Sequence, residues 1–272
     1  MDRTCVVTGA ASGIGAATAA RLRASGARVI SCDLHDAEVI ADLTTLEGRT
    51  ALVEGVKTAS GGRIDAIVAN AGGGPAETSL QLNFFGAVAN LEGLRPLLAG
   101  SVAPRAVAVS SISALRSPPP KLVDFCLAMD EAGALAEARR AYRAGELGQA
   151  SSGLVPDVAQ LSLDLYGAAK RALQLWCRRA APTPEWGGAG IPLNVVALGF
   201  FDTPAAAYVL SDPQHREAMG RMVPLAGAFP GRPEEAAALL AWCVDPANSQ
   251  MTGQILFADA GVECLARSDL SA

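Results

Sequence analysis

The chain of 272 residues is half hydrophobic and has a formal net charge of −5 at pH 7. This length and composition fit one large α/β domain spanning residues 1–272, with a well-filled core, better than two small domains. The negative charge, without any basic cluster, argues against nucleic acid or an anionic membrane surface as a partner.

No apolar run approaches the ~18 residues that span a bilayer, and the first residues lead into a strand-like segment without a signal peptide. The six cysteines are scattered with no Cys-x-x-Cys pair, which is typical of core residues in a reduced protein. Only two histidines, His35 and His215, are available for a metal centre or a hydrolase triad. We therefore expect a cytoplasmic protein without a metal site.

Short β-rich runs alternate with longer helical segments along the chain. Six apolar runs are typical of strands buried on both faces: residues 5–8, 28–32, 66–69, 106–109, 193–197 and 255–258. Helical periodicity covers five further segments: residues 14–24, 46–58, 80–98, 158–179 and 233–244. This alternation predicts a doubly wound parallel sheet of the Rossmann type.

Two segments interrupt the alternation. Between Asp33 and the apolar run at residues 39–43, too few residues remain for the usual crossover helix. Either this connection is a bare loop, or residues 39–43 are not a parallel strand. The second segment, residues 115–156, opens with three prolines and looks helical over residues 128–145. We interpret it as a helical insertion before Tyr166.

A glycine-rich turn at residues 8–15 follows the first expected strand and opens the first helix. Gly9, Gly13 and Gly15 would let backbone N–H groups approach a pyrophosphate at the positive end of that helix. The spacing Gly-x-x-x-Gly-x-Gly departs from the Gly-x-Gly-x-x-Gly fingerprint, so a plain turn is the alternative.

Asp33 ends the second expected strand, where a carboxylate can accept both ribose hydroxyls of adenosine and would repel a 2′-phosphate. This favours NAD over NADP as the cofactor. Arg28 and His35 keep NADP open, and a simple loop cap is the alternative role for Asp33.

Several motifs occur in the order seen in short-chain dehydrogenases/reductases, and the chain resembles that superfamily over nearly its whole length. They are the turn at residues 8–15, Asn70-Ala71-Gly72, Asn83, Ser110-Ser111, Tyr166-x-x-x-Lys170 and Asn194 with Gly199. Residues 36–43 and 47–49 further resemble the bacterial 3α-hydroxysteroid dehydrogenase/carbonyl reductase group. That resemblance implies a short second crossover and an insertion before the tyrosine.

The resemblance implies that Tyr166 is the general acid/base. Positions i and i+4 share a helix face, so the Lys170 ammonium would lie near the phenol. A tyrosine needs its pKa lowered from about 10 toward neutrality, which Lys170 and a cationic nicotinamide could supply together. Ser111 would hold the substrate oxygen, with Ser110 and Ser113 as competitors.

The resemblance gives the remaining residues roles around the cofactor. Asn83 would hold a water linking Lys170 to solvent, with a locally bonded helix residue as the alternative. The other residues implied to bind the dinucleotide are Gly9, Ser12, Gly13, Ile14 and Gly15 in the turn, Asp42 and Leu43 beside the adenine, Ala71 and Gly72 beside the ribose, and Thr203 at the carboxamide, together with Tyr166 and Lys170.

Two departures from the family pattern stand out. Leu198-Gly199 replaces the usual Pro-Gly and is followed by two aromatics. Candidates to line an apolar pocket are Phe200, Phe201, Tyr208, Met219 and Met222, although their spacing fits ordinary core equally well. The insertion could obstruct the helix pairing by which many family members form tetramers, so we favour a homodimer.

These observations predict an NAD-dependent dehydrogenase acting on a small apolar secondary alcohol or ketone. A 3α-hydroxysteroid is the best guess from the resemblance, and an aryl or terpenoid alcohol is the alternative. A non-catalytic nucleotide-binding sensor belongs to a different class, and such proteins typically lose the tyrosine or the lysine. An epimerase or dehydratase is less favoured, because such enzymes usually have a longer substrate domain.

Overall fold

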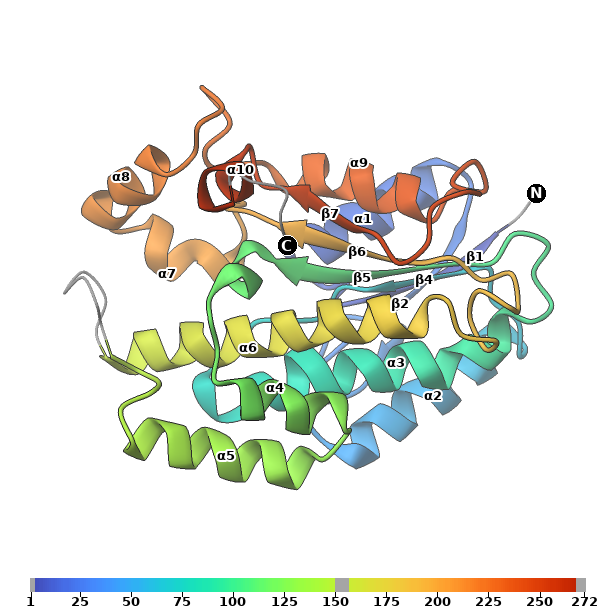
Figure 1. The fold of residues 1–272 in the computed structure, drawn as a ribbon. Helices are drawn as coiled ribbons and strands as arrows, with labels where there is room; N and C mark the ends of the chain where they lie inside the picture. The colour runs from blue at the N-terminus through green and yellow to red at the C-terminus, as the bar shows by residue number, and fades with distance from the viewer. Residues whose placement is uncertain (1–2, 150–156, 268–272) are drawn as a thin grey trace.

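The computed structural model describes residues 3–149 and 157–267. Their centre is a seven-stranded sheet with the order β3-β2-β1-β4-β5-β6-β7, in which every neighbouring pair is parallel (Figure 1). The strands are β1 (Thr4–Thr8), β2 (Arg28–Asp33), β3 (Val39–Ile40), β4 (Ala66–Ala69), β5 (Arg105–Ser111), β6 (Leu193–Leu198) and β7 (Ile255–Ala258). The predicted doubly wound parallel sheet is confirmed.

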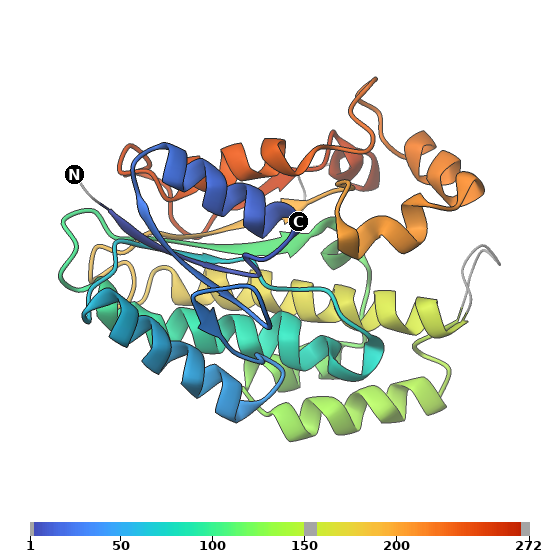
Figure 2. The same ribbon diagram turned by 180° about the vertical axis from the view of Figure 1, so that it is seen from behind.

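Helices cover both faces of the sheet (Figures 1 and 2). One face packs against α1 (Gly13–Ala24) and α9 (Pro233–Cys243), and the other against α2 (Leu46–Ser60), α3 (Ala87–Leu94) and α6 (Asp157–Ala180). Successive strand residues point to opposite faces, so Val6 and Ile67 enter one apolar cluster while Val7 and Val68 enter the other. Four of the five predicted helical segments are therefore present with small shifts at their ends, and the fifth, predicted over residues 80–98, is divided into shorter parts.

The shorter elements lie mainly at the carboxyl edge of the sheet. They are 3₁₀ turns at Ala76–Thr78, Arg95–Leu98, Ile112–Leu115 and Pro204–Ala206, and helices α7 (Ala207–Leu210), α8 (Pro213–Arg221) and α10 (Val262–Ala266). Helices α7 and α8 have no counterpart among the elements predicted from the sequence. They form the protruding pair at the left of Figure 1, beyond the ends of the strands.

The connection from β2 to β3 is a bare loop, and β3 pairs in parallel with β2 through Cys32 with Val39 and Asp33 with Ile40. A short loop suffices because β3 is only two residues long, so the chain needs to return by only that length before pairing. The first alternative is therefore the correct one, although the strand is shorter than the apolar run at residues 39–43.

The segment predicted as one helix over residues 80–98 has three parts. A π-helical stretch at Gln81–Gly86 leads into α3, and a 3₁₀ turn with Pro96 ends it. At Gly86 a Cβ would lie 2.9 Å from the Leu43 carbonyl oxygen, so the helix can approach the loop after β3 closely. Wide π turns are frequent at functional sites, and this one contains Asn83.

The insertion forms two helices, α4 (Pro120–Leu127) and α5 (Glu131–Arg143), where the sequence predicted one helix over residues 128–145. The break has a local cause. Met129 adopts a left-handed φ of 58°, and the Asp130 carboxylate accepts from the Gly133 N–H at 2.8 Å, which caps α5. The later part of the predicted insertion, residues 150–156, lies outside the described residues.

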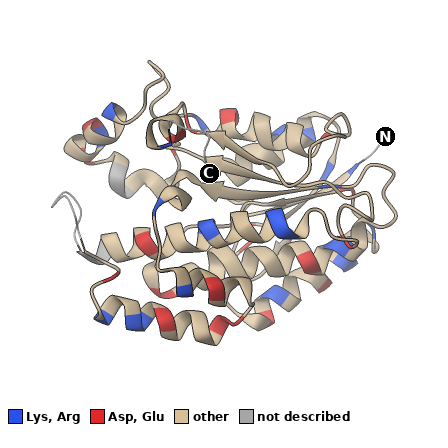
Figure 3. Cartoon of the chain, viewed as in Figure 1, with Lys and Arg blue, Asp and Glu red and all other residues tan. Residues whose placement is uncertain are grey.

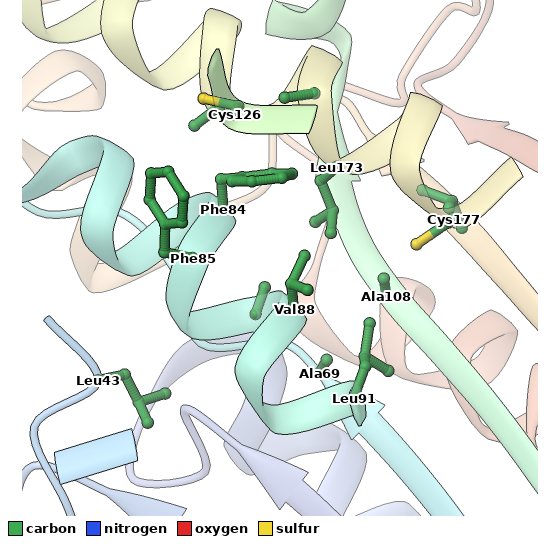
Figure 4. Close-up of a cluster of buried hydrophobic side chains, with 14 of the residues drawn as sticks. Leu43, Ala69, Phe84, Phe85, Val88, Leu91, Ala108, Cys126, Leu173 and Cys177 are labelled. Atoms are coloured by element: carbon green, nitrogen blue, oxygen red, sulfur yellow. The ribbon is translucent and has the colours of Figure 1, made fainter. Parts of the chain in front are cut away.

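The insertion shares the core of one sheet face. Cys126 of α4 lies near Phe84 and Leu173 in the buried cluster shown in Figure 4. Arg49 of α2 joins Glu131 of α5 at 2.6 Å and also donates to the Leu43 carbonyl at 2.9 Å. Charges of both signs are interspersed along α5 and α6, while the strands carry few (Figure 3). The insertion is thus tied to the loop that follows β3.

Five cysteines are buried and free, whereas Cys264 is exposed on α10. The prediction that all six are core residues is therefore wrong for Cys264, since the short α10 packs its Val262 inward and leaves the thiol outside. Within residues 3–149 and 157–267, no group of three His, Cys, Asp or Glu side chains could hold a metal. No helix in this same part of the chain is long and apolar enough to cross a membrane.

Candidate active site

A cleft of about 640 Å³ runs along the carboxyl ends of the strands. It lies where the strand order reverses between β1 and β4, which is where open parallel sheets bind ligands. Most of the predicted site residues line it: Gly9, Ser12, Gly13, Ile14, Gly15, Asp33, Asp42, Leu43, Ala71, Gly72, Ser111, Tyr166, Lys170 and Thr203. Asn83 is not among the described lining residues.

The glycine-rich turn joins β1 to the N-terminus of α1. Gly9 and Gly13 have φ values of 69° and 53°, in the region that favours glycine. A Cβ on Gly15 would lie 1.9 Å from the Gly9 carbonyl oxygen, so no larger residue fits there. The turn therefore leaves open backbone beside a helix N-terminus, a cradle that fits the pyrophosphate of a dinucleotide.

Asp33 is held at the end of β2 beside this turn. Its carboxylate accepts from the Ala11 N–H at 2.8 Å and from the Leu34 N–H at 2.7 Å, and its side chain is 15% exposed. Each oxygen keeps a lone pair for a ligand hydroxyl. Asp33 thus gives this part of the cleft a negative charge. The two oxygens of its carboxylate are placed to accept hydrogen bonds from a ribose diol.

The two basic residues considered for a 2′-phosphate differ in position. Arg28 begins β2, at the opposite end of the strand from Asp33, and its guanidinium donates to Glu38 and to the Ala59 carbonyl. His35 is 72% exposed, with Nδ1 4.0 Å from an Asp33 oxygen. Only His35 is therefore close enough to act on the ribose end of the cleft.

Two loops line the side of the cleft where the sequence predicts the adenosine to bind. Asp42 Oδ1 accepts from the N–H and the hydroxyl of Thr44, which closes a tight turn, and Leu43 is buried beside it. After β4, the Thr8 hydroxyl accepts from the Ala71 N–H at 3.0 Å and thereby ties this segment to β1. These bonds hold Asp42, Leu43 and Ala71 at the cleft independently of any ligand.

Helix α6 carries Tyr166 and Lys170 one turn apart on the face that meets the cleft. Lys170 is 2% exposed, donates from Nζ to the Val109 carbonyl at 2.8 Å, and lies 5.5 Å from the centre of the Tyr166 ring. Burial lowers the pKa of Lys170 to about 7, because desolvation penalises the ammonium. The predicted pairing of the two side chains is present.

The two serines at the end of β5 occupy different environments. Ser110 is 1% exposed, and its hydroxyl is bonded to Gln174 and to the Lys170 carbonyl. Ser111 caps the following 3₁₀ turn, with its hydroxyl accepting from the Ser113 N–H at 3.1 Å, and is 8% exposed at the cleft. The Ser111 proton is not used in that bond, so this hydroxyl can still donate to a substrate oxygen.

Asn83 is completely buried and bonded locally. Its Nδ2 donates to the Gly73 and Ser79 carbonyls, and its Oδ1 accepts from the Gly73 N–H, all at 2.9 Å. It is nevertheless near Lys170, because a Cβ on Gly72 would lie 2.8 Å from Asn83 Oδ1 and 3.1 Å from Lys170 Nζ. The hydrogen bonds of Asn83 are therefore those of the alternative, a locally bonded residue. The side chain nevertheless lies beside Lys170.

Only some of the residues predicted to line an apolar pocket lie at the cleft. Phe200, Phe201 and Met219 line the cleft, whereas Met222 is 52% exposed and is not among the described lining residues. The Tyr208 side chain lies outside the described part of the chain. Ser162, Leu163 and Leu210 also line the cleft and were not predicted from the sequence. The helical period could have located Ser162, which precedes Tyr166 by one turn.

The parallel sheet, the glycine cradle at a helix N-terminus and the Tyr166–Lys170 pair define a dinucleotide-binding oxidoreductase of the Rossmann class. Residues 3–122 match the short chain dehydrogenase family, and residues 150–263 match the enoyl-(acyl carrier protein) reductase family of the same superfamily.

Curated relatives match over nearly their whole length. The chain is 34% identical to the 3-alpha-hydroxysteroid dehydrogenase/carbonyl reductase of Comamonas testosteroni, over 96% of this chain and 97% of that protein. It is 32% identical to the cis-4-hydroxycyclohexanecarboxylate dehydrogenase of Sinomonas cyclohexanicum, with 96% of each chain covered.

Among solved structures, the 3-alpha-hydroxysteroid dehydrogenase of Pseudomonas sp. B-0831, complexed with NADH, superposes with a TM-score of 0.83 at 34% identity, covering 98% of this chain and 99% of that one. The chain belongs to the short-chain dehydrogenase/reductase family. It is an oxidoreductase of that family, similar to the 3-alpha-hydroxysteroid dehydrogenase/carbonyl reductase.

Proposed function

We propose that the protein is an NAD-dependent dehydrogenase that interconverts an apolar secondary alcohol and its ketone, with a 3α-hydroxysteroid as the favoured substrate. The Asp33 carboxylate carries the cofactor assignment, because it lies in the cleft with lone pairs free for a ribose diol and would repel a 2′-phosphate. The NADH in the Pseudomonas structure supports the same choice.

The cleft favours an uncharged substrate. Lys170 is the one lysine or arginine among its described lining residues, and it is buried beneath Tyr166. Phe200, Leu210 and Met219 supply apolar surface on the side away from Asp33. By their names, both curated relatives act on a compound with a hydroxyl group on a ring system, and the substrate of the second also carries a carboxylate. A cyclic secondary alcohol without a carboxylate is consistent with this lining.

In this proposal Tyr166 moves the proton. In the oxidation direction the carbinol O–H passes its proton to the phenolate oxygen of Tyr166, while Ser111 donates to the same substrate oxygen and holds it in place. Lys170 in its ammonium form stabilises the phenolate through its charge, and the phenolate in turn favours that protonated form of the lysine. A bound nicotinamide would supply the acceptor for the hydride of the carbinol carbon. Ser12, Ile14 and Thr203 lie where they would contact the dinucleotide.

We also propose a homodimer. Helix α4 packs beside α6, and α5 packs outside α4 (Figure 1), where the two helices would obstruct the helix pairing that many family members use to form tetramers.

The test is NADH formation from NAD⁺ across a panel of 3α-hydroxysteroids, simple cyclohexanols, and aryl and terpenoid alcohols. We expect turnover with the hydroxysteroids and little with NADP⁺. Turnover restricted to aryl or terpenoid alcohols would replace the substrate assignment by that alternative. Tight NADH binding without turnover of any alcohol would favour a nucleotide-binding sensor.

Replacing Asp33 by serine is expected to lower kcat/KM with NAD⁺ about 10- to 100-fold, because hydrogen bonds from the ribose to a charged acceptor are lost. The same change should raise kcat/KM with NADP⁺, because the repulsion of a 2′-phosphate is removed. The matched control is Asp36→Asn, which removes an exposed charge of the same loop outside the cleft. An unchanged preference in Asp33→Ser would contradict the assignment.

A further inference from the structure

A buried series of hydrogen bonds, which we call the Ser110–Gln174 chain of hydrogen bonds, lies directly behind the Tyr166–Lys170 pair. Gln174 Nε2 donates to the Ser110 hydroxyl at 3.0 Å, and that hydroxyl donates to the Lys170 carbonyl at 3.2 Å. Ser110 and Gln174 are each 1% exposed. With the bond from Lys170 Nζ to the Val109 carbonyl at 2.8 Å, three hydrogen bonds join two consecutive residues of β5 to two successive turns of α6.

The surroundings of this chain are apolar. Ala108 of β5 and Leu173 and Cys177 of α6 are buried in the cluster of Figure 4. Polar side chains in such a place are unfavourable unless they are bonded, and an alanine and a leucine would fill the same space without that requirement. The polar pair adds a geometric constraint. Hydrogen bonds depend on distance and angle, so they define the register of a strand and a helix more narrowly than apolar contacts do.

The register concerned is the one between the proposed catalytic groups. Ser110 immediately precedes Ser111, and Gln174 follows Tyr166 by two helical turns on the same face of α6. The Ser110–Gln174 chain of hydrogen bonds therefore joins the strand residue next to Ser111 to the helix that carries Tyr166. A shift of α6 along β5 would change the separation of the two hydroxyls that must meet one substrate oxygen.

We propose that Ser110 and Gln174 are positioning residues that hold α6 in register with β5 and thereby set the distance between the Ser111 and Tyr166 hydroxyls. This inference rests on the proposed function for the roles of Ser111 and Tyr166. Misplacement of reacting groups by about 1 Å can cost about 100-fold in rate, so the effect should appear in kcat.

The test compares Ser110→Ala, Gln174→Leu and the double variant with the wild-type enzyme. We expect each single change to lower kcat about 10- to 100-fold, with the alcohol KM and the NADH Kd within about twofold of wild type. The double variant should lose no more than the more affected single variant, because both changes break one chain. Ser110→Thr, which retains the hydroxyl, should stay within about threefold.

The control is Asn248→Leu. Asn248 is a buried amide that donates to the Cys243 carbonyl at 2.9 Å, and it lies just beyond the end of α9, at the amino edge of the sheet. The Asn248→Leu variant should have a lower Tm, as the test variants should, because a buried hydrogen bond is lost in each. Its kcat should equal that of the wild-type enzyme. Unchanged kcat in both single variants, or an equal loss of kcat in the control, would overturn the proposal.

A second measurement separates this proposal from the proposed function. Crystal structures of wild type and Gln174→Leu should show a changed separation between Ser111 Oγ and Tyr166 Oη, whether or not a substrate has been found. Identical separations overturn the positioning role. Wild-type protein that turns over no alcohol overturns the proposed function and leaves the structural comparison as the deciding result.

Discussion

Replacing Tyr166 by phenylalanine is expected to lower kcat about 10²- to 10⁴-fold, which is the usual contribution of a general acid/base. The ring remains, so the packing of α6 and the 5.5 Å contact with Lys170 are retained while the proton-transferring oxygen is lost. NADH binding should persist, because the glycine cradle and Asp33 are untouched. Initial rates and NADH fluorescence titration measure the two properties separately.

The control for this variant is Tyr142→Phe. Tyr142 lies on α5 and is 51% exposed, so the same chemical change is made outside the cleft. Its kcat should equal that of wild type. Full activity in Tyr166→Phe would remove Tyr166 from the mechanism, and loss of NADH binding there would indicate a structural defect in place of a catalytic one.

Raising the pH from 8 to 10 is expected to lower the free energy of unfolding by about 4 kcal/mol. Burial raises the pKa of Cys5 to about 11, raises those of Cys32, Cys126 and Cys243 to about 12, and raises that of Cys177 as well, from the ordinary value of 9.0. Above pH 9 the unfolded chain loses these protons and the folded chain keeps them. Stability must therefore fall as pH rises through that range.

The size follows from two opposed contributions. Each thiol costs about 1 to 2 kcal/mol between pH 8 and 10, so five cost about 7 kcal/mol. Lys170 acts in the other direction, because its pKa is lowered from 10.5 to about 7 and the unfolded chain holds the extra proton. Lys170 therefore raises the free energy of unfolding by about 2 to 3 kcal/mol as pH rises from 8 to 10. The net loss is then about 4 kcal/mol.

Urea unfolding at pH 8, 9 and 10 with a reductant present measures this dependence. Cys126→Ala should make the loss of stability with pH smaller by about 1 kcal/mol, whereas Cys264→Ser should not change it, since that thiol is exposed. A free energy of unfolding that is constant or rises over this range would contradict the predicted burial of the thiols.

Much of the site could be predicted because its signals are local. The turn at residues 8–15 needs glycine at Gly9, Gly13 and Gly15, and the i, i+4 spacing places Tyr166 and Lys170 on one face of a helix. These properties depend on neighbours in the chain. They are therefore visible before any long-range contact is known.

Other features depended on contacts between distant segments. The sequence favoured Ser111 over its neighbour Ser110 only through the preceding strand, and packing against α6 places Ser110 beneath the helix and Ser111 at the cleft. The break at Met129 arises from a left-handed residue and a cap that the alanine-rich pattern concealed. Helices α7 and α8 were not predicted because their segments lack a clear apolar period, although Met219 of α8 was predicted as a pocket residue.

The fold class, the family resemblance and the glycine-rich turn before α1 could all be predicted from the amino-acid sequence, because strand and helix periods and glycine requirements are local properties of the chain. Tertiary structure alone decided that Arg28 lies at the far end of β2 from Asp33, that Lys170 is buried, and that Gln174 reaches Ser110. Burial and hydrogen bonding between β5 and α6 join residues some sixty positions apart in the chain, a separation over which no local pattern extends.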